Sequence, residues 1–91
     1  MKEQQLYDNE MYDYVARDLA KRYGYEVSDH IIDVMMSVMK TRDGYWQGGG
    51  FVQAIIDNNL DEACSRADDD CIKHLRLFSL VKRFGHIRQN V

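Results

Sequence analysis

The sequence predicts an all-α fold, and three features of its 91 residues point to that class. The chain contains no proline, and it is rich in the good helix formers Ala, Leu, Met, Lys and Arg. Apolar residues recur at helical spacing over most of the chain, and turn signals separate these periodic segments. We therefore expect a single domain, residues 1–91, built as a compact bundle of about five helices with a Gly-rich loop in the middle.

The first helix is predicted over residues 5–23. Met11, Val15 and Leu19 recur at helical spacing and form its apolar stripe. Most charged residues of the segment fall off that stripe, so we expect one face to pack against the domain and the other to face water. Gly24 follows and can adopt the left-handed conformation that ends many helices.

The second helix is predicted over residues 28–41, with Ser28 as its N-cap. Its apolar positions, from Ile31 to Met39, cover a wide arc of the helix surface. A helix that is apolar on most sides lies at the centre of its domain or is covered by a second chain. The sequence therefore predicts a central helix and also raises the hypothesis of a homodimer.

Three further helices are predicted over residues 50–57, 60–67 and 70–84, and the first two of them are short. Asp61 is expected to cap the second of these helices. The last helix is the most clearly amphipathic. The expected inward positions of this helix are Cys71 or Ile72, Leu75, Phe78, Val81 or Leu80, and Phe84. Residues 86–91 form a short tail after it.

Three consecutive glycines, Gly48–Gly50, lie before the third helix. Ordering three glycines costs more backbone entropy than ordering any other three residues, so a geometric reason is expected, such as a close approach of the chain. A helix N-terminus after glycines also suits a phosphate. However, a Walker loop needs a Lys-Ser/Thr pair and a preceding strand, and both are missing. We favour the steric explanation.

The composition indicates a cytoplasmic protein with no membrane contact. No apolar run approaches the roughly 20 residues that a membrane-spanning helix requires. The first ten residues, MKEQQLYDNE, lack the apolar core of a signal peptide. Two cysteines fit a reducing compartment and are too few for a disulfide scaffold.

The sequence contains no recognisable catalytic motif, because its Ser and His residues stand in no known nucleophile pattern. A metal site would use Cys64, Cys71 and His74, with His86 as the nearest fourth ligand. Structural zinc sites normally need two closely spaced ligand pairs, which this arrangement lacks. We therefore predict a non-enzymatic protein without a metal or a cofactor.

Exposed aromatic and acidic residues predict a protein-binding surface. Tyr14 falls off the apolar stripe of its helix, and Tyr45 and Trp46 stand in a loop, so all three are hard to bury. Aromatic residues are enriched in interface hot spots. The acids before the last helix could also imitate nucleic-acid phosphates towards a basic protein groove. The predicted protein-binding residues are Tyr14, Tyr45, Trp46, Asp61, Glu62, Asp68, Asp69 and Asp70.

An uneven charge distribution supplies the alternative functional hypothesis. Residues 1–70 carry a net charge of −8 and residues 71–91 carry +5, which together give the −3 of the chain. Acids at the start of the last helix and bases towards its end also suit the helix macrodipole. The alternative is a small nucleic-acid-binding regulator that uses the basic last helix, residues 73–88. Its candidate contacts are Lys73, Arg76, Lys82, Arg83 and Arg88.

One block of the sequence, residues 44–68, resembles small proteins of tailed bacteriophages and prophages. The block reads GYWQGGGFVQAIIDNNLDEACSRAD. It combines a Gly-rich turn, an aromatic-led helix from Gly50-Phe51, an Asn-x-Leu turn at residues 58–60 and an Ala-Asp ending. The basic tail departs from the family pattern. The resemblance implies a module in the host cytoplasm that binds a host protein or complex and inhibits or modulates it, for example a CRISPR-type defence complex.

Overall fold

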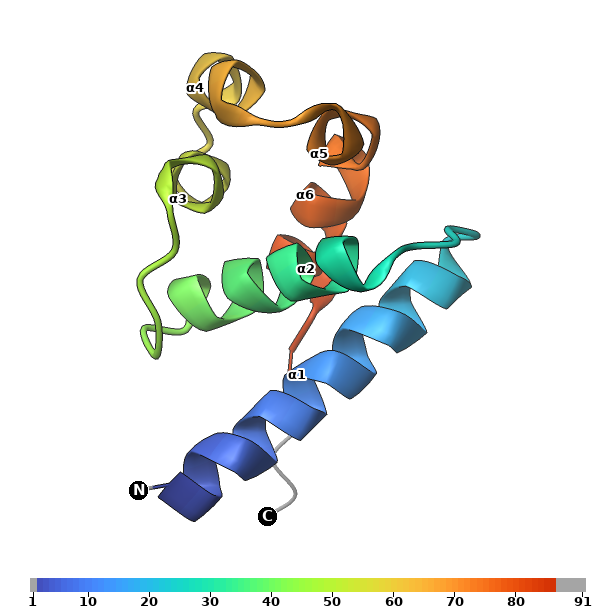
Figure 1. Cartoon of the computed structure of the whole chain (residues 1–91), viewed down its shortest axis with the longest axis vertical. Helices are drawn as coiled ribbons and strands as arrows, with labels where there is room; N and C mark the ends of the chain where they lie inside the picture. The colour runs from blue at the N-terminus through green and yellow to red at the C-terminus, as the bar shows by residue number, and fades with distance from the viewer. Residues whose placement is uncertain (1, 87–91) are drawn as a thin grey trace.

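The fold is all-α, as the sequence predicts (Figure 1). The computed structural model describes residues 2–86, with side chains described from Asn9 onward. Within residues 2–86 there are six helices and no strand, and each helix is too short or too polar to cross a lipid bilayer. In chain order the helices are α1 (Lys2–Arg22), α2 (Asp29–Arg42), α3 (Gly50–Ile56), α4 (Leu60–Arg66), α5 (Asp69–Lys73) and α6 (Leu75–Phe84).

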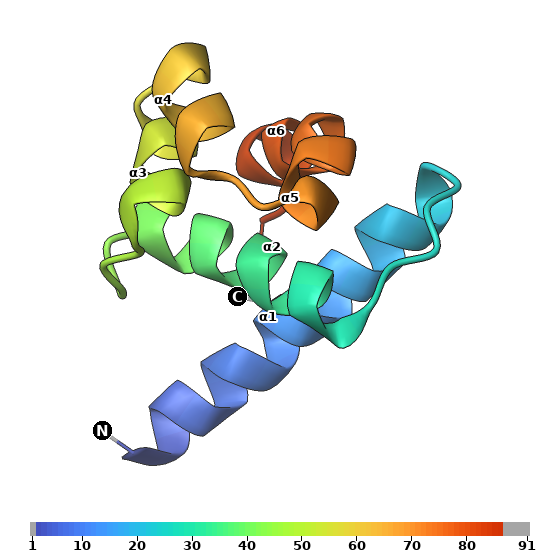
Figure 2. The same ribbon diagram turned by 45° about the horizontal axis from the view of Figure 1, so that its top comes forward.

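Helix α2 lies at the centre of the domain. Helices α1, α3 and α6 pack against it, while α4 packs on α3 and α5 on α6 (Figures 1 and 2). The buried residues of α2 are Ile31, Ile32, Met35, Val38 and Met39. Because helices of the same chain cover this wide apolar arc, its burial requires no second copy. The central position of the helix is as predicted, but α2 does not support the homodimer hypothesis.

Local sequence signals set several helix boundaries. Gly24, with φ of +79°, follows α1 in the left-handed conformation. Ser28 caps α2, and its hydroxyl oxygen accepts a hydrogen bond from the N–H of Ile31 at 3.3 Å. Both features agree with the predictions.

The prediction that Asp61 caps α4 is wrong. The cap is Asn59, whose side-chain oxygen accepts a hydrogen bond from the N–H of Glu62 at 3.1 Å. Asn58 adopts the left-handed conformation, with φ of +59°, and completes the turn after α3. The next helix therefore starts at Leu60, and Asp61 lies within its first turn.

The predicted last helix, residues 70–84, is two helices. The backbone of His74, with φ of −114° and ψ of 16°, is not helical and separates α5 from α6. Leu77 is fully buried, although the single-helix pattern does not place it inward. Phe84, which the single-helix pattern places inward, is exposed, and the neighbouring Gly85 is buried. A Cβ on Gly85 would lie 2.9 Å from the sulfur of Met39.

The steric explanation for the triple glycine holds at Gly48. A Cβ there would lie 2.5 Å from Cγ1 of Val52 and 3.0 Å from the hydroxyl oxygen of Thr41. That hydroxyl also accepts a hydrogen bond from the N–H of Gly48, at 3.0 Å. At Gly50 an added Cβ would lie 2.7 Å from Cδ of Arg66, a flexible side chain of α4, and at Gly49 it would meet nothing within 4 Å. The close approach therefore concerns two glycines of the three.

A polar network joins α1, α2 and α6 at one end of the core. The guanidinium of Arg42 donates to both carboxylate oxygens of Asp43 and to the carbonyl oxygens of Val81 and Lys82 at the end of α6. Asp43 also accepts a hydrogen bond of 2.7 Å from the hydroxyl of the buried Tyr12. Burial acts to raise the pKa of Asp43, but the hydrogen bonds from Arg42 and Tyr12 outweigh it and hold that pKa below 3.8.

Replacing Leu77 by Ala is expected to lower the free energy of unfolding by about 2–5 kcal/mol, because it leaves a cavity in the core. The matched change, Phe84→Ala, should lower it by less than about 1 kcal/mol, because that side chain lies mostly in water. Urea unfolding followed by circular dichroism measures both values. Equal losses would contradict the assignment of Leu77 as the inward residue.

Replacing Asp43 by Asn is expected to destabilise the protein at about pH 6 and to matter less as the pH falls. The folded-state pKa lies below the ordinary value, so the ionised carboxylate stabilises the fold above about pH 3.8, and this contribution is lost as the pH falls through the folded pKa. Urea unfolding of both proteins between about pH 6 and pH 2.5 tests this. A difference that stays constant over that range would exclude the proposed linkage.

Candidate functional site

A groove of about 560 Å³ lies between α1 and the end of α6. Its apolar lining residues are Met11, Tyr14, Val15, Leu19 and Phe84. Its polar lining residues are Glu10, Asp18, Arg22 and His86. Residues three and four apart share one face of a helix, which explains why α1 supplies most of the lining. The apolar stripe predicted for the first helix therefore points partly into this groove as well as into the core.

Two aromatic side chains in the groove are unusually exposed. Tyr14 on α1 is 72% exposed, and Phe84 at the end of α6 is 58% exposed. The apolar residues that line the groove beside them are Leu19, which is buried, and Met11 and Val15, which are half-buried. A single exposed apolar residue is ordinary, whereas a concave apolar patch with two exposed aromatics is typical of binding surfaces.

Charged groups line the groove beside these apolar residues. Asp18 and Arg22 form an ion pair of 3.0 Å along α1, and Glu10 lies about two turns before Asp18. Exposed ion pairs of this kind contribute little to stability. The groove therefore combines apolar residues with charged groups, as the centre and rim of a protein interface do.

The predicted protein-binding residues are spread over the molecule. Tyr14 lies in the groove, whereas Tyr45 and Trp46 lie on the loop after α2, 67% and 57% exposed. The ammonium group of Lys40 lies 5.6 Å from the centre of the Trp46 ring, within the range of a cation–π contact.

The predicted acidic residues lie away from α1, on α4 and α5 at the other end of the molecule (Figures 1 and 2). Asp61 and Glu62 lie on α4, where Glu62 pairs with Arg66 at 2.5 Å. Asp68 caps α5, and Asp69 and Asp70 occupy its first turn. The acidic and the aromatic residues of the prediction therefore do not form one surface.

The basic residues of the alternative hypothesis are partly committed to other contacts. The ammonium group of Lys82 donates to the carbonyl oxygen of Ile55 at 2.9 Å and to the side chain of Asn58 at 2.6 Å. The interruption at His74 places Lys73 on α5, on a different helix from Arg76 and Arg83. Arg88 lies outside the described residues. Among the described bases, Lys82 is therefore committed to a contact with α3 and the turn after it, while Lys73, Arg76 and Arg83 are exposed.

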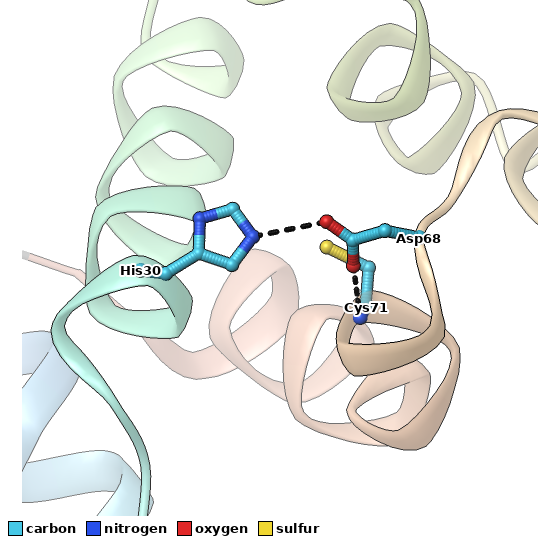
Figure 3. A group of neighbouring side chains, drawn as sticks. All are labelled: His30, Asp68 and Cys71. Carbon is cyan, nitrogen blue, oxygen red and sulfur yellow. Dashed lines mark hydrogen bonds and ion pairs between the residues drawn. The ribbon is translucent and has the colours of Figure 1, made fainter.

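A second cluster of chemically active side chains joins α2 to the start of α5 (Figure 3). The Nε2 of His30 donates to a carboxylate oxygen of Asp68 at 3.1 Å. The other oxygen of Asp68 accepts a hydrogen bond of 2.7 Å from the N–H of Cys71. One ligand atom from each of the three residues lies within 4.8 Å of the other two.

The metal ligands considered from the sequence are not brought together in this way. Cys64 is exposed on α4, and the Nδ1 of His74 lies 2.6 Å from the carbonyl oxygen of Asp70. Cys71 instead has His30 as its neighbour, 41 positions earlier in the chain. Sequence spacing could have indicated only the Asp68-x-x-Cys71 pair, because the approach of His30 depends on how α5 packs near α2.

The three side chains do not form a Cys–His–Asp catalytic triad. Burial raises the pKa of the Cys71 thiol to about 11, which keeps it protonated near neutral pH. A triad also requires the histidine to contact the nucleophile and the carboxylate through different ring nitrogens. In Figure 3 the Nε2 of His30 faces both Asp68 and Cys71, and its other nitrogen points away from them.

Comparisons with protein-family models, with curated proteins and with solved structures return no match for this chain. The resemblance of residues 44–68 to phage proteins therefore stays a prediction.

The two cysteines are expected to differ strongly in reactivity. Cys64 is exposed and Cys71 is buried with a raised pKa, so a thiol reagent should label one cysteine per native chain quickly and the second only after unfolding. Labelling with a chromogenic disulfide, with and without denaturant, measures the two rates. The change Cys64→Ser should remove the fast phase, and its persistence would contradict the assignment.

Proposed function

We propose that the chain is a non-enzymatic protein-binding module that docks a segment of its partner into the groove between α1 and α6. The observation that carries this proposal is the pairing of two exposed aromatics, Tyr14 and Phe84, on the two helices that line an apolar groove. Aromatic anchors surrounded by apolar contacts are the usual energetic centres of protein interfaces.

The chemistry of the groove indicates the kind of segment that would bind. Met11, Val15 and Leu19 favour apolar side chains at the centre of the partner segment. Because Arg22 pairs with Asp18, Glu10 leaves the lining acidic on balance and favours a Lys or Arg beside it, in line with the net acidity of residues 1–70. We therefore expect an apolar segment flanked by basic residues, supplied by another protein.

The biological context of the proposal comes from the resemblance of residues 44–68 to phage proteins. On that basis the partner is a host protein or complex that the module inhibits or modulates, and a CRISPR-type defence complex is one such target. Tyr45 and Trp46, on the loop that opens this block, form a second contact surface in the proposal because both are exposed. Nucleic-acid binding through Arg76 and Arg83 remains the alternative.

Replacing Tyr14 by Ala is expected to weaken partner binding by about 2 kcal/mol or more, which is roughly 30-fold in Kd. The partner is first captured from a nuclease-treated bacterial lysate and identified by mass spectrometry. It is then purified and titrated against the parent chain and the variants by isothermal calorimetry. Phe84→Ala should give a loss similar to that of Tyr14→Ala.

The matched control is Tyr23→Ala, since Tyr23 is an exposed tyrosine just beyond α1 that does not line the groove. Binding should survive this change, and it should also survive the double change of Arg76 and Arg83 to Ala. Capture that disappears on nuclease treatment, or binding that depends on the two arginines rather than on Tyr14, would replace the proposal with the nucleic-acid alternative.

A further inference from the structure

Three different metal-binding side chains meet at the junction of α2 and α5. His30 lies in the first turn of α2, Asp68 caps α5, and Cys71 lies three residues later, on the same side of that short helix (Figure 3). One ligand atom of each lies within 4.8 Å of the others, and the His30–Asp68 pair is already at 3.1 Å.

These separations are close to those of a tetrahedral zinc site. Zinc bonds of about 2.0–2.3 Å to nitrogen, oxygen and sulfur place neighbouring ligand atoms about 3.3–3.7 Å apart. The His30 and Asp68 atoms therefore need almost no adjustment. The sulfur of Cys71 needs to move by no more than about 1 Å, given that it lies within 4.8 Å of both.

We propose that His30, Asp68 and Cys71 form a binding site for one zinc-class metal ion. Imidazole, thiolate and carboxylate are the three ligand types that zinc accepts together, whereas Mg²⁺ and Ca²⁺ prefer oxygen ligands alone. His30 and Asp68 are exposed, so the fourth position is open to water. Such an ion links the start of α2 to the start of α5.

The surroundings of the cluster support this assignment. The N–H of Cys71 holds one oxygen of Asp68 at 2.7 Å, which leaves the other oxygen directed at His30. A hydrogen bond that orients a ligating carboxylate in this way is a regular feature of protein metal sites. Asp69 and Asp70 in the same turn add negative charge that favours a cation.

The experiment is a titration of the tag-free, reduced chain with Co²⁺, which takes the place of zinc and reports its ligands by absorption. We expect one ion per chain, visible bands typical of tetrahedral Co²⁺ and a thiolate-to-cobalt charge-transfer band in the near ultraviolet. Added Zn²⁺ should bleach these bands because zinc binds such ligands more tightly than cobalt.

Paired variants identify the ligands. Cys71→Ser should abolish the charge-transfer band, and the matched change Cys64→Ser should leave it intact. His30→Gln and Asp68→Asn should each weaken Co²⁺ binding about tenfold or more. Asn remains a good N-cap, so Asp68→Asn preserves the start of α5, and circular dichroism confirms that each variant is folded.

Three results would overturn the proposal. The first is the absence of a charge-transfer band from the parent chain, which would leave the cluster as a hydrogen-bonded contact between α2 and α5. The second is a band that requires Cys64 and not Cys71. The third is an affinity for Co²⁺ that neither His30→Gln nor Asp68→Asn changes.

Discussion

The burial of α2 is the constraint on which the rest of the structure depends. Its apolar residues face several directions, and each buried side chain of the size of Ile or Met contributes roughly 1.5–3 kcal/mol only when it is removed from water. No single neighbouring helix could cover them all. The chain therefore packs α1, α3 and α6 against α2, and the short helices α4 and α5 attach to α3 and α6. A domain of this size satisfies the wide apolar arc by itself, which is why the arc is a poor indicator of a dimer.

The same constraint produces the groove. The network of Arg42, Asp43 and Tyr12 holds α1 and the end of α6 on the same end of α2. At that end of α6 the buried Gly85 lies against Val81 and Met39, while the preceding side chain, Phe84, lies mostly in water. The exposed aromatic on α6 thus stands beside a buried glycine, whereas Tyr14 is exposed because it lies off the stripe of α1. The structure places both beside one concavity.

Local signals allowed much of the fold to be predicted, and long-range packing limited the rest. Ser28 and Gly24 act through their own backbone and nearest neighbours, so their roles could be predicted from the sequence. Residues 70–84 have helical propensity throughout, and the helical pattern does not mark the interruption at His74. There the Nδ1 of His74 lies 2.6 Å from the carbonyl oxygen of Asp70, the acceptor that the His74 N–H would use in a continuous helix. The interruption shifts the inward positions to include Leu77. Of the exposed aromatics in the groove, the sequence indicated only Tyr14. The contact between His30 and Asp68 could not be predicted, because 38 positions separate the two residues in the chain.

The two candidate sites lie at opposite ends of the central helix. His30 belongs to the first turn of α2, while Arg42, at its last residue, binds the end of α6 that carries Phe84. A metal ion bound by His30, Asp68 and Cys71 and a partner segment bound in the groove between α1 and α6 would share no contact residue. Coupling between them would therefore have to pass through α2 or through α5 and α6, and packed helices transmit a change only when they have two discrete arrangements.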